Sequence, residues 1–79
     1  MNRTELLHCT ATDRTRWLRE VWRNFADARR PWRFLDAVAS LQPIAEPRDG
    51  DDITEGLRRL ANYQLLVAEA CLLVARGGP

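Results

Sequence analysis

The sequence predicts an all-α fold, a helical hairpin whose first arm is kinked or broken at Pro31 and which dimerises into a four-helix assembly. Apolar residues recur at alternating spacings of three and four along residues 18–39 and 53–74, and this is the period of a packed helix. A proline-containing acidic segment separates the two stretches, as expected of a linker. The second stretch also holds more apolar side chains than one neighbouring helix can cover.

With 79 residues, the chain is expected to form a single small helical domain, residues 1–79. A domain of this size buries only about 60% of the surface of its unfolded chain, so it usually needs a disulfide, a metal or a partner chain. Cys9, Cys71 and His8 lack the spacing of a zinc site. We expect two reduced thiols, with Cys71 as a small core residue, and a bridge between Cys9 and Cys71 is the alternative.

The first arm is expected to begin at Thr12 and Asp13, which supply an N-cap and a carboxylate in the first helical turn. Its helix covers residues 13–30. In the segment before it, Leu6 and Leu7 are expected to pack onto a neighbouring helix.

A heptad seam runs along this arm. It comprises Leu18, Val21, Phe25, Ala28, Trp32, Leu35 and Ala39. Pro31 interrupts it, because proline lacks the N–H that a continuous helix needs. We therefore expect a kink, or a second helix over residues 31–42 that starts at Pro31, with the seam continuing in phase and Trp32 in the core.

An acidic linker over residues 43–51 leads to the last helix, residues 52–76. Asp52 is expected to cap this helix with Glu55 three positions later. A second heptad seam follows, made of Ile53, Leu57, Leu60, Gln64, Val67, Cys71 and Val74.

The second half of this helix, residues 65–75, is apolar on all sides. One hairpin cannot bury every side chain, and each large one left in water forgoes about 1.5–3 kcal/mol. We expect a homodimer with this helix near the two-fold axis. Its expected interface comprises Leu65, Leu66, Val67, Leu72 and Leu73. A three-helix monomer and a subunit that needs a different protein are the alternatives.

Charge is unevenly distributed along the chain. Residues 14–33 contain seven arginines and two acids, a local charge of +5, whereas residues 46–55 contain five acids and one arginine, a local charge of −4. Local ion pairs explain part of the arginine face. Tryptophan beside arginine is also typical of protein-binding sites. The expected partner-binding surface comprises Trp22, Arg23, Arg29, Arg30 and Arg33.

Several functional classes find no support in these residues. His8 and Cys9 are neighbours in the chain without a third orienting group, and no glycine-rich phosphate loop is present. We therefore expect no enzymatic activity, no cofactor and no metal. Glu69 interrupts the longest apolar run, which excludes a membrane span. We expect a protein of the cytoplasm.

The layout PWRFLDAVASL, an acidic linker, then ITEGLRRLANYQLLVAEACLLVA resembles the small helical-hairpin anti-activators of pseudomonads and their phages. Anti-CRISPR and other phage counter-defence proteins have the same size and character. The likeness covers residues 25–76. It implies a dimer that inhibits a quorum-sensing regulator or a bacterial defence complex, in a bacterial or phage-infected cell, and it transfers no binding residue by position.

Three functions remain. The leading hypothesis is a non-enzymatic homodimer that binds and inhibits or regulates a larger protein. The first alternative is a nucleic-acid-binding regulator that uses the arginines of the first helix, in which case binding weakens steeply with salt. The second alternative is an assembly or structural subunit whose last helix completes a foreign bundle.

Overall fold

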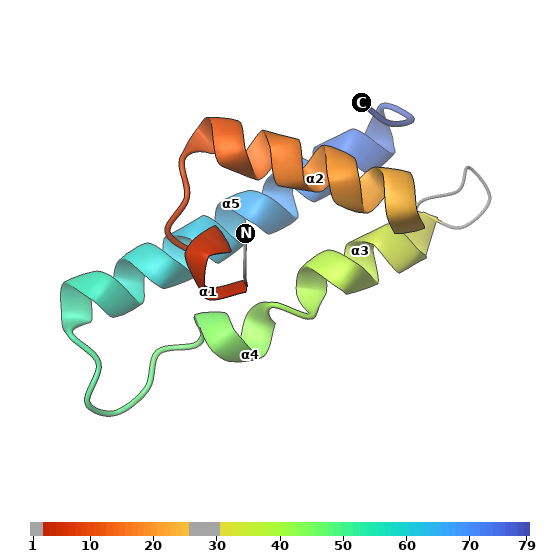
Figure 1. The fold of residues 1–79 in the computed structure, drawn as a ribbon. Coiled ribbons are helices and arrows are strands. Elements are labelled where there is room, and N and C mark those ends of the chain that lie inside the picture. Colours follow the sequence, from red (N-terminus) through yellow and green to blue (C-terminus); the bar gives the residue numbers. More distant parts are fainter. Residues whose placement is uncertain (1–2, 26–30) are drawn as a thin grey trace.

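The computed structural model describes residues 3–25 and 31–79 (Figure 1). Within these ranges the chain is all-helical and has no strand, so the predicted all-α class is confirmed. The helices are α1 (Arg3–Leu6), α2 (Ala11–Phe25), α3 (Pro31–Ala39), α4 (Gln42–Ala45) and α5 (Ile53–Ala75).

Helix α2 begins two residues earlier than predicted, because Thr10 and not Thr12 precedes its first turn. The Thr10 hydroxyl accepts a hydrogen bond from the Asp13 N–H at 3.2 Å and donates one to the Asp13 carboxylate at 3.1 Å. The Thr10 carbonyl accepts the first helical bond, from the Arg14 N–H. Thr10 therefore satisfies a backbone donor that the helix leaves unpaired.

Helices α2 and α3 lie side by side and run in opposite directions, and both pack against α5 (Figure 1). Pro31 is the first residue of α3, a position that suits its missing N–H. The rings of Trp22 and Phe34 meet edge to face across α2 and α3, 5.2 Å apart. The chain thus reverses direction between α2 and α3 instead of continuing along one bent arm.

The first heptad seam does not continue in phase into α3. Phe34 and Val38 are the buried residues of this helix, whereas Trp32 is 70% exposed and Ala39 is exposed. The expectation that Trp32 belongs to the core is wrong, because the reversal rotates α3 relative to the direction of α2. In α2, Leu18 and Val21 are buried as predicted, Phe25 is exposed, and Ala28 lies outside the described residues.

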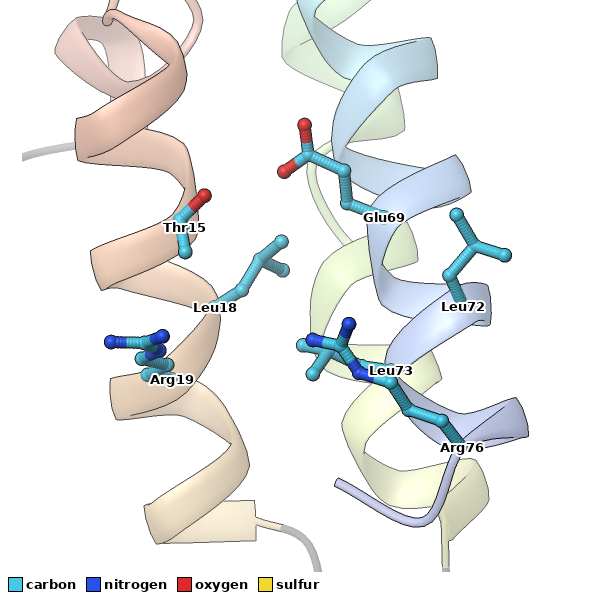
Figure 2. Close-up of a pocket in the computed structure, with 7 residues that line it drawn as sticks. All are labelled: Thr15, Leu18, Arg19, Glu69, Leu72, Leu73 and Arg76. Carbon is cyan, nitrogen blue, oxygen red and sulfur yellow. The ribbon is translucent and has the colours of Figure 1, made fainter. Parts of the chain in front are cut away.

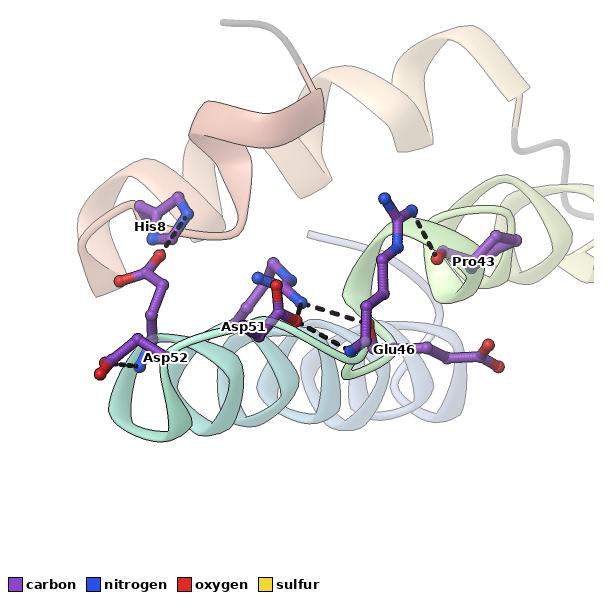
Figure 3. A network of polar contacts seen from close by, with 8 residues as sticks. His8, Pro43, Glu46, Asp51 and Asp52 are labelled. Carbon is purple, nitrogen blue, oxygen red and sulfur yellow. Dashed lines mark hydrogen bonds and ion pairs between the residues drawn. The ribbon is translucent and has the colours of Figure 1, made fainter.

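Part of the predicted linker is helical. Helix α4 begins three positions after the last residue of α3, and its Ala45 is fully buried. The remaining loop is held by Asp51, which accepts hydrogen bonds from the Arg59 guanidinium at 2.6 Å and from the Arg48 N–H at 2.9 Å (Figure 3). Asp52 then caps α5 by accepting a bond from the Glu55 N–H at 3.1 Å, which confirms the predicted cap.

The core lies where the helices converge on one side of α5. Its buried apolar residues are Leu6, Leu7, Leu18, Val21, Phe34, Val38, Leu41, Ala45, Leu66, Ala70 and Leu73. Leu6 and Leu7 are buried as predicted. The side chain of Asn62 on α5 donates to the Leu7 carbonyl at 2.6 Å, so the segment that follows α1 is tied to α5 by a polar as well as an apolar contact.

Candidate interaction surface

Helix α5 is covered by the rest of the chain on one side only. At 3.6 residues per turn, eight residues share the opposite side, which we call the outer face of α5. They are Ile53, Leu57, Leu60, Ala61, Gln64, Ala68, Cys71 and Ala75. All except the half-buried Leu60 are exposed, Ile53 to 78%. None of them is charged, although a solvated helix side normally carries charges.

An apolar pocket of about 180 Å³ lies along one edge of this face, between α5 and α3. Its residues are Leu35, Asp36, Val38, Ala39, Tyr63, Val67, Ala70 and Cys71. Val67 and Cys71 belong to the second predicted heptad seam, and Leu35 and Ala39 belong to the first. The α3 part of the first seam and the second seam therefore meet at a groove on the surface of the chain.

A second pocket, of about 140 Å³, lies along the other edge, between α5 and α2 (Figure 2). Leu18, Leu72 and Leu73 form its apolar part, and Arg19 and Arg76 stand at its rim with Thr15 and Glu69. Leu72 is 66% exposed. The pocket therefore joins apolar surface of α5 to the arginines of α2.

The exposed side of α2 carries a row of three arginines, Arg16, Arg19 and Arg23. They line a shallow depression together with Thr12, Thr15 and Glu20. Arg16 lies 3.9 Å from the Asp13 carboxylate. Within residues 3–25 and 31–79, neither Arg19 nor Arg23 makes an ion pair. Their positive charges are available to a partner.

Of the predicted partner-binding residues, Arg23 and Arg33 are exposed, whereas Arg29 and Arg30 lie outside the described residues. Trp22 is half-buried: its ring packs on Phe34, and a Cβ added to Gly78 would approach that ring to 3.0 Å. Trp22 therefore contributes to the packing of α2 on α3, and its assignment to the partner-binding surface stays a prediction.

The predicted dimer interface divides between core and surface. Leu66 and Leu73 are buried within the chain's own core, so their assignment to an interface is corrected. Val67 is half-buried, and Leu65 and Leu72 remain exposed. When a helix is apolar on all sides, the positions of the neighbouring helices decide which side is buried. The sequence alone does not show which side that is.

Sequence reasoning missed a charge inside the bundle. Arg14 on α2 is only 8% exposed. Its Nε donates to the Glu69 carboxylate at 3.1 Å and its Nη1 to the Asn62 side-chain oxygen at 3.4 Å. A buried guanidinium requires such partners. Arg14 looks like any other arginine of the helix in sequence, and only the distant carboxylate at position 69 distinguishes it.

Both cysteines are free thiols, so the alternative of a bridge is excluded. Cys71 is exposed, which corrects its assignment to the core. Cys9 is half-buried and donates to the Leu6 carbonyl at 2.9 Å. Burial raises the pKa of the Cys9 thiol, although the nearby Arg14 opposes that effect. A raised pKa keeps this thiol protonated and a poor nucleophile at neutral pH.

The single histidine of the chain lies beside a carboxylate of α5. His8 lies 3.1 Å from the Glu55 carboxylate (Figure 3). Among residues 3–25 and 31–79, no group of three or more His, Cys, Asp or Glu side chains is arranged to hold a metal ion. None of the helices in those ranges has the length and apolar character needed to span a membrane.

Comparison of the chain with protein-family models, curated proteins and solved structures finds no match.

Proposed function

We propose that this chain is a non-enzymatic protein that acts by binding a larger protein, and that it does so as a homodimer joined through the outer face of α5. The observation that carries the proposal is the uncharged character of this face. Contiguous apolar surface of this extent is typical of interaction sites.

The size of the face suits a second copy of the chain. The 23 residues of α5 span about 35 Å. Together with the adjoining edge of α3, at a usual spacing of 8–10 Å between helix axes, the surface is about 20 Å wide. The resulting area of about 700 Å² approaches the roughly 800 Å² that each partner buries in a stable complex.

The arginine row of α2 is the proposed site for the larger partner, with Arg33 as an additional exposed cation. Guanidinium groups without partners favour a carboxylate-rich protein surface. Inhibition of a bacterial regulator or of a defence complex is the form of this function that the resemblance to anti-activators implies.

Molecular mass in solution tests the dimer. We expect sedimentation equilibrium to give twice the chain mass for the wild type and the single-chain mass for Leu57→Arg, which places a charge on the outer face. Asn24→Arg is the matched control, because Asn24 is exposed on α2, and it should remain dimeric. A folded wild-type monomer at high concentration would contradict the proposal.

Charge reversal tests the partner site. The triple variant Arg16→Glu, Arg19→Glu, Arg23→Glu should lose the proteins that the wild type retains from a bacterial lysate, while its mass in solution stays dimeric. Arg58→Glu, an exposed arginine of α5 outside the row, is the control and should retain them. Equal recovery by all three proteins would count against the arginine row.

Nucleic acid is the second candidate, and the same three arginines favour it, because phosphates attract a row of exposed guanidinium groups. Glu20 in the same depression disfavours it. Fluorescence anisotropy with a labelled duplex and a labelled single strand decides between the candidates. Affinity that falls steeply with salt and disappears in the triple variant would support nucleic acid, and a flat titration at low salt would exclude it.

A further inference from the structure

We infer that two copies pair with their α5 helices antiparallel, Gln64 of each lying on the two-fold axis. The inference rests on the dimer proposed above and specifies its geometry. Helix α5 runs from Ile53 to Ala75, and Gln64 is its middle residue and belongs to the outer face. In an antiparallel pair centred on Gln64, each residue of one α5 lies opposite a residue of the second copy. The two residues are equally far from Gln64 in the sequence, one before it and the other after it.

This pairing sets the large side chains of the outer face against small ones. Ile53 opposes Ala75 of the second copy, Leu57 opposes Cys71, and Leu60 opposes Ala68. The three large residues lie in the first half of α5 and their small partners in the second half. Facing large and small residues interdigitate and fill the space between two helices without voids. The outer face is therefore complementary to itself in the antiparallel sense.

The helix dipoles favour the same orientation. An antiparallel pair sets the positive amino end of each α5 beside the negative carboxyl end of its neighbour.

Gln64 can fix the register of the pair. It is the only amide among the eight outer-face residues, and an amide both donates and accepts hydrogen bonds. Two glutamines related by a two-fold axis can satisfy each other, whereas a slipped register would bury one of them against an apolar side chain. A single buried polar residue specifies register in paired helices by this penalty.

A parallel pair would be less favourable on each count. It would crowd Ile53 and Leu57 against their own copies and leave space between the alanines of the second half. It would also set the like ends of the two helix dipoles side by side, which is unfavourable. The two arrangements further differ in the separation of the two Cys71 thiols, which would meet in a parallel pair and lie about 21 Å apart along the antiparallel one.

Disulfide trapping with copper phenanthroline tests the geometry, on full-length chains carrying Cys9→Ala so that residue 71 is the only native thiol. We expect no covalent dimer from Cys71 alone. Gln64→Cys with Cys71→Ala should trap a dimer, because the axis brings the two Cα atoms within the range of about 4.4–6.8 Å that a disulfide needs. Leu57→Cys should trap a dimer with Cys71 present and fail to do so with Cys71→Ala.

Trapping by Cys71 alone would overturn the antiparallel arrangement in favour of the parallel one. Failure of every pair in a chain that remains dimeric by mass would show that another face mediates dimerisation, which leaves the proposed homodimer intact but removes this inference. A monomeric mass of the reduced wild type would instead overturn the proposed homodimer itself. Circular dichroism checks that each variant keeps the helical content of the wild type.

Discussion

At the scale of single residues, Arg14 shows how a cation becomes part of the interior. Its guanidinium is held by Glu69 and Asn62, and Asn62 in turn binds the Leu7 carbonyl. Three segments that are distant in sequence meet at this one group. The contact therefore stabilises the position of α2 on α5, and it removes Glu69 from the charges that would otherwise face a partner.

Removal of Glu69 should destabilise the fold more than removal of an exposed acid. We expect Glu69→Ala to lower the free energy of unfolding by about 1.5–3 kcal/mol, because the buried Arg14 loses its charged partner. Glu20→Ala is the control, since Glu20 is exposed on α2, and it should change stability by less than about 0.5 kcal/mol. Both substitutions are made in the monomeric Leu57→Arg variant, so that urea unfolding measures the stability of the single chain without a contribution from association. Equal values would contradict a structural role for the pair.

Asp51 should contribute a pH dependence to stability. The hydrogen bond from Arg59, aided by that from the Arg48 N–H, lowers the pKa of Asp51 below its ordinary value of 3.8. The folded state thus binds the proton less readily than the unfolded state, so the stabilisation is complete above about pH 4 to 5 and is lost as pH falls through the folded-state pKa.

The variant Asp51→Asn tests this linkage. Its melting temperature should lie below that of the wild type at pH 7, and the gap should narrow as pH falls below about 4. Asp49→Asn, an exposed neighbour in the same loop, serves as the control. A gap that stays constant down to pH 2.5 would contradict the role assigned to the Asp51 carboxylate.

At the scale of helices, local sequence features such as proline and capping residues predicted where helices begin better than residue spacing predicted which side of each helix is buried. Pro31 predicted the start of α3, and Asp52 predicted the cap of α5. Both signals act within a few residues of where they occur. The side of α3 that is buried depends instead on where the chain turns back after α2, and the spacing of Trp32, Leu35 and Ala39 cannot report that turn. In α3 the seam was a correct sign of helix and a wrong sign of core, whereas in α2 it correctly predicted that Leu18 and Val21 are buried.

Substitution of two aromatic residues of α3 tests which side of this helix is buried. Phe34→Ala should cost about 3–5 kcal/mol, because it empties a fully buried site. Trp32→Ala removes a larger side chain two positions away but should cost less than about 0.5 kcal/mol in the monomeric Leu57→Arg background, since Trp32 is 70% exposed. Chemical unfolding of the two variants decides the matter, and a larger loss for Trp32→Ala would show that the predicted seam is the core after all.

At the scale of the whole molecule, the chain buries one side of its longest helix and leaves the other without charge or cover. Part of the predicted apolar surplus is accounted for, because Leu66 and Leu73 lie inside the bundle. The outer face remains, and Leu65 and Leu72 border it. Homodimerisation therefore stays a proposal. The proposed interface is now the outer face along the full length of α5 instead of the predicted residues 65–73.

Association of this kind makes thermal stability depend on concentration. The melting temperature of the wild type should rise as protein concentration is raised a hundredfold, because dimerisation stabilises only the folded chain. The melting temperature of Leu57→Arg should stay constant over the same range. A constant value for both, measured by differential scanning calorimetry, would indicate that the outer face of α5 remains in water.

The sequence by itself determined the helical class, the break at Pro31, the cap at Asp52 and the excess of apolar residues in the last helix, because helix period, proline geometry and capping act over a few neighbouring residues. Only the tertiary structure decided which side of each helix is covered, which arginine is buried, that Trp22 packs on Phe34, and that the α3 part of the first heptad seam meets the second seam at a surface groove. Those properties depend on the angle at which helices distant in sequence meet, and side-chain period along one helix does not contain that angle.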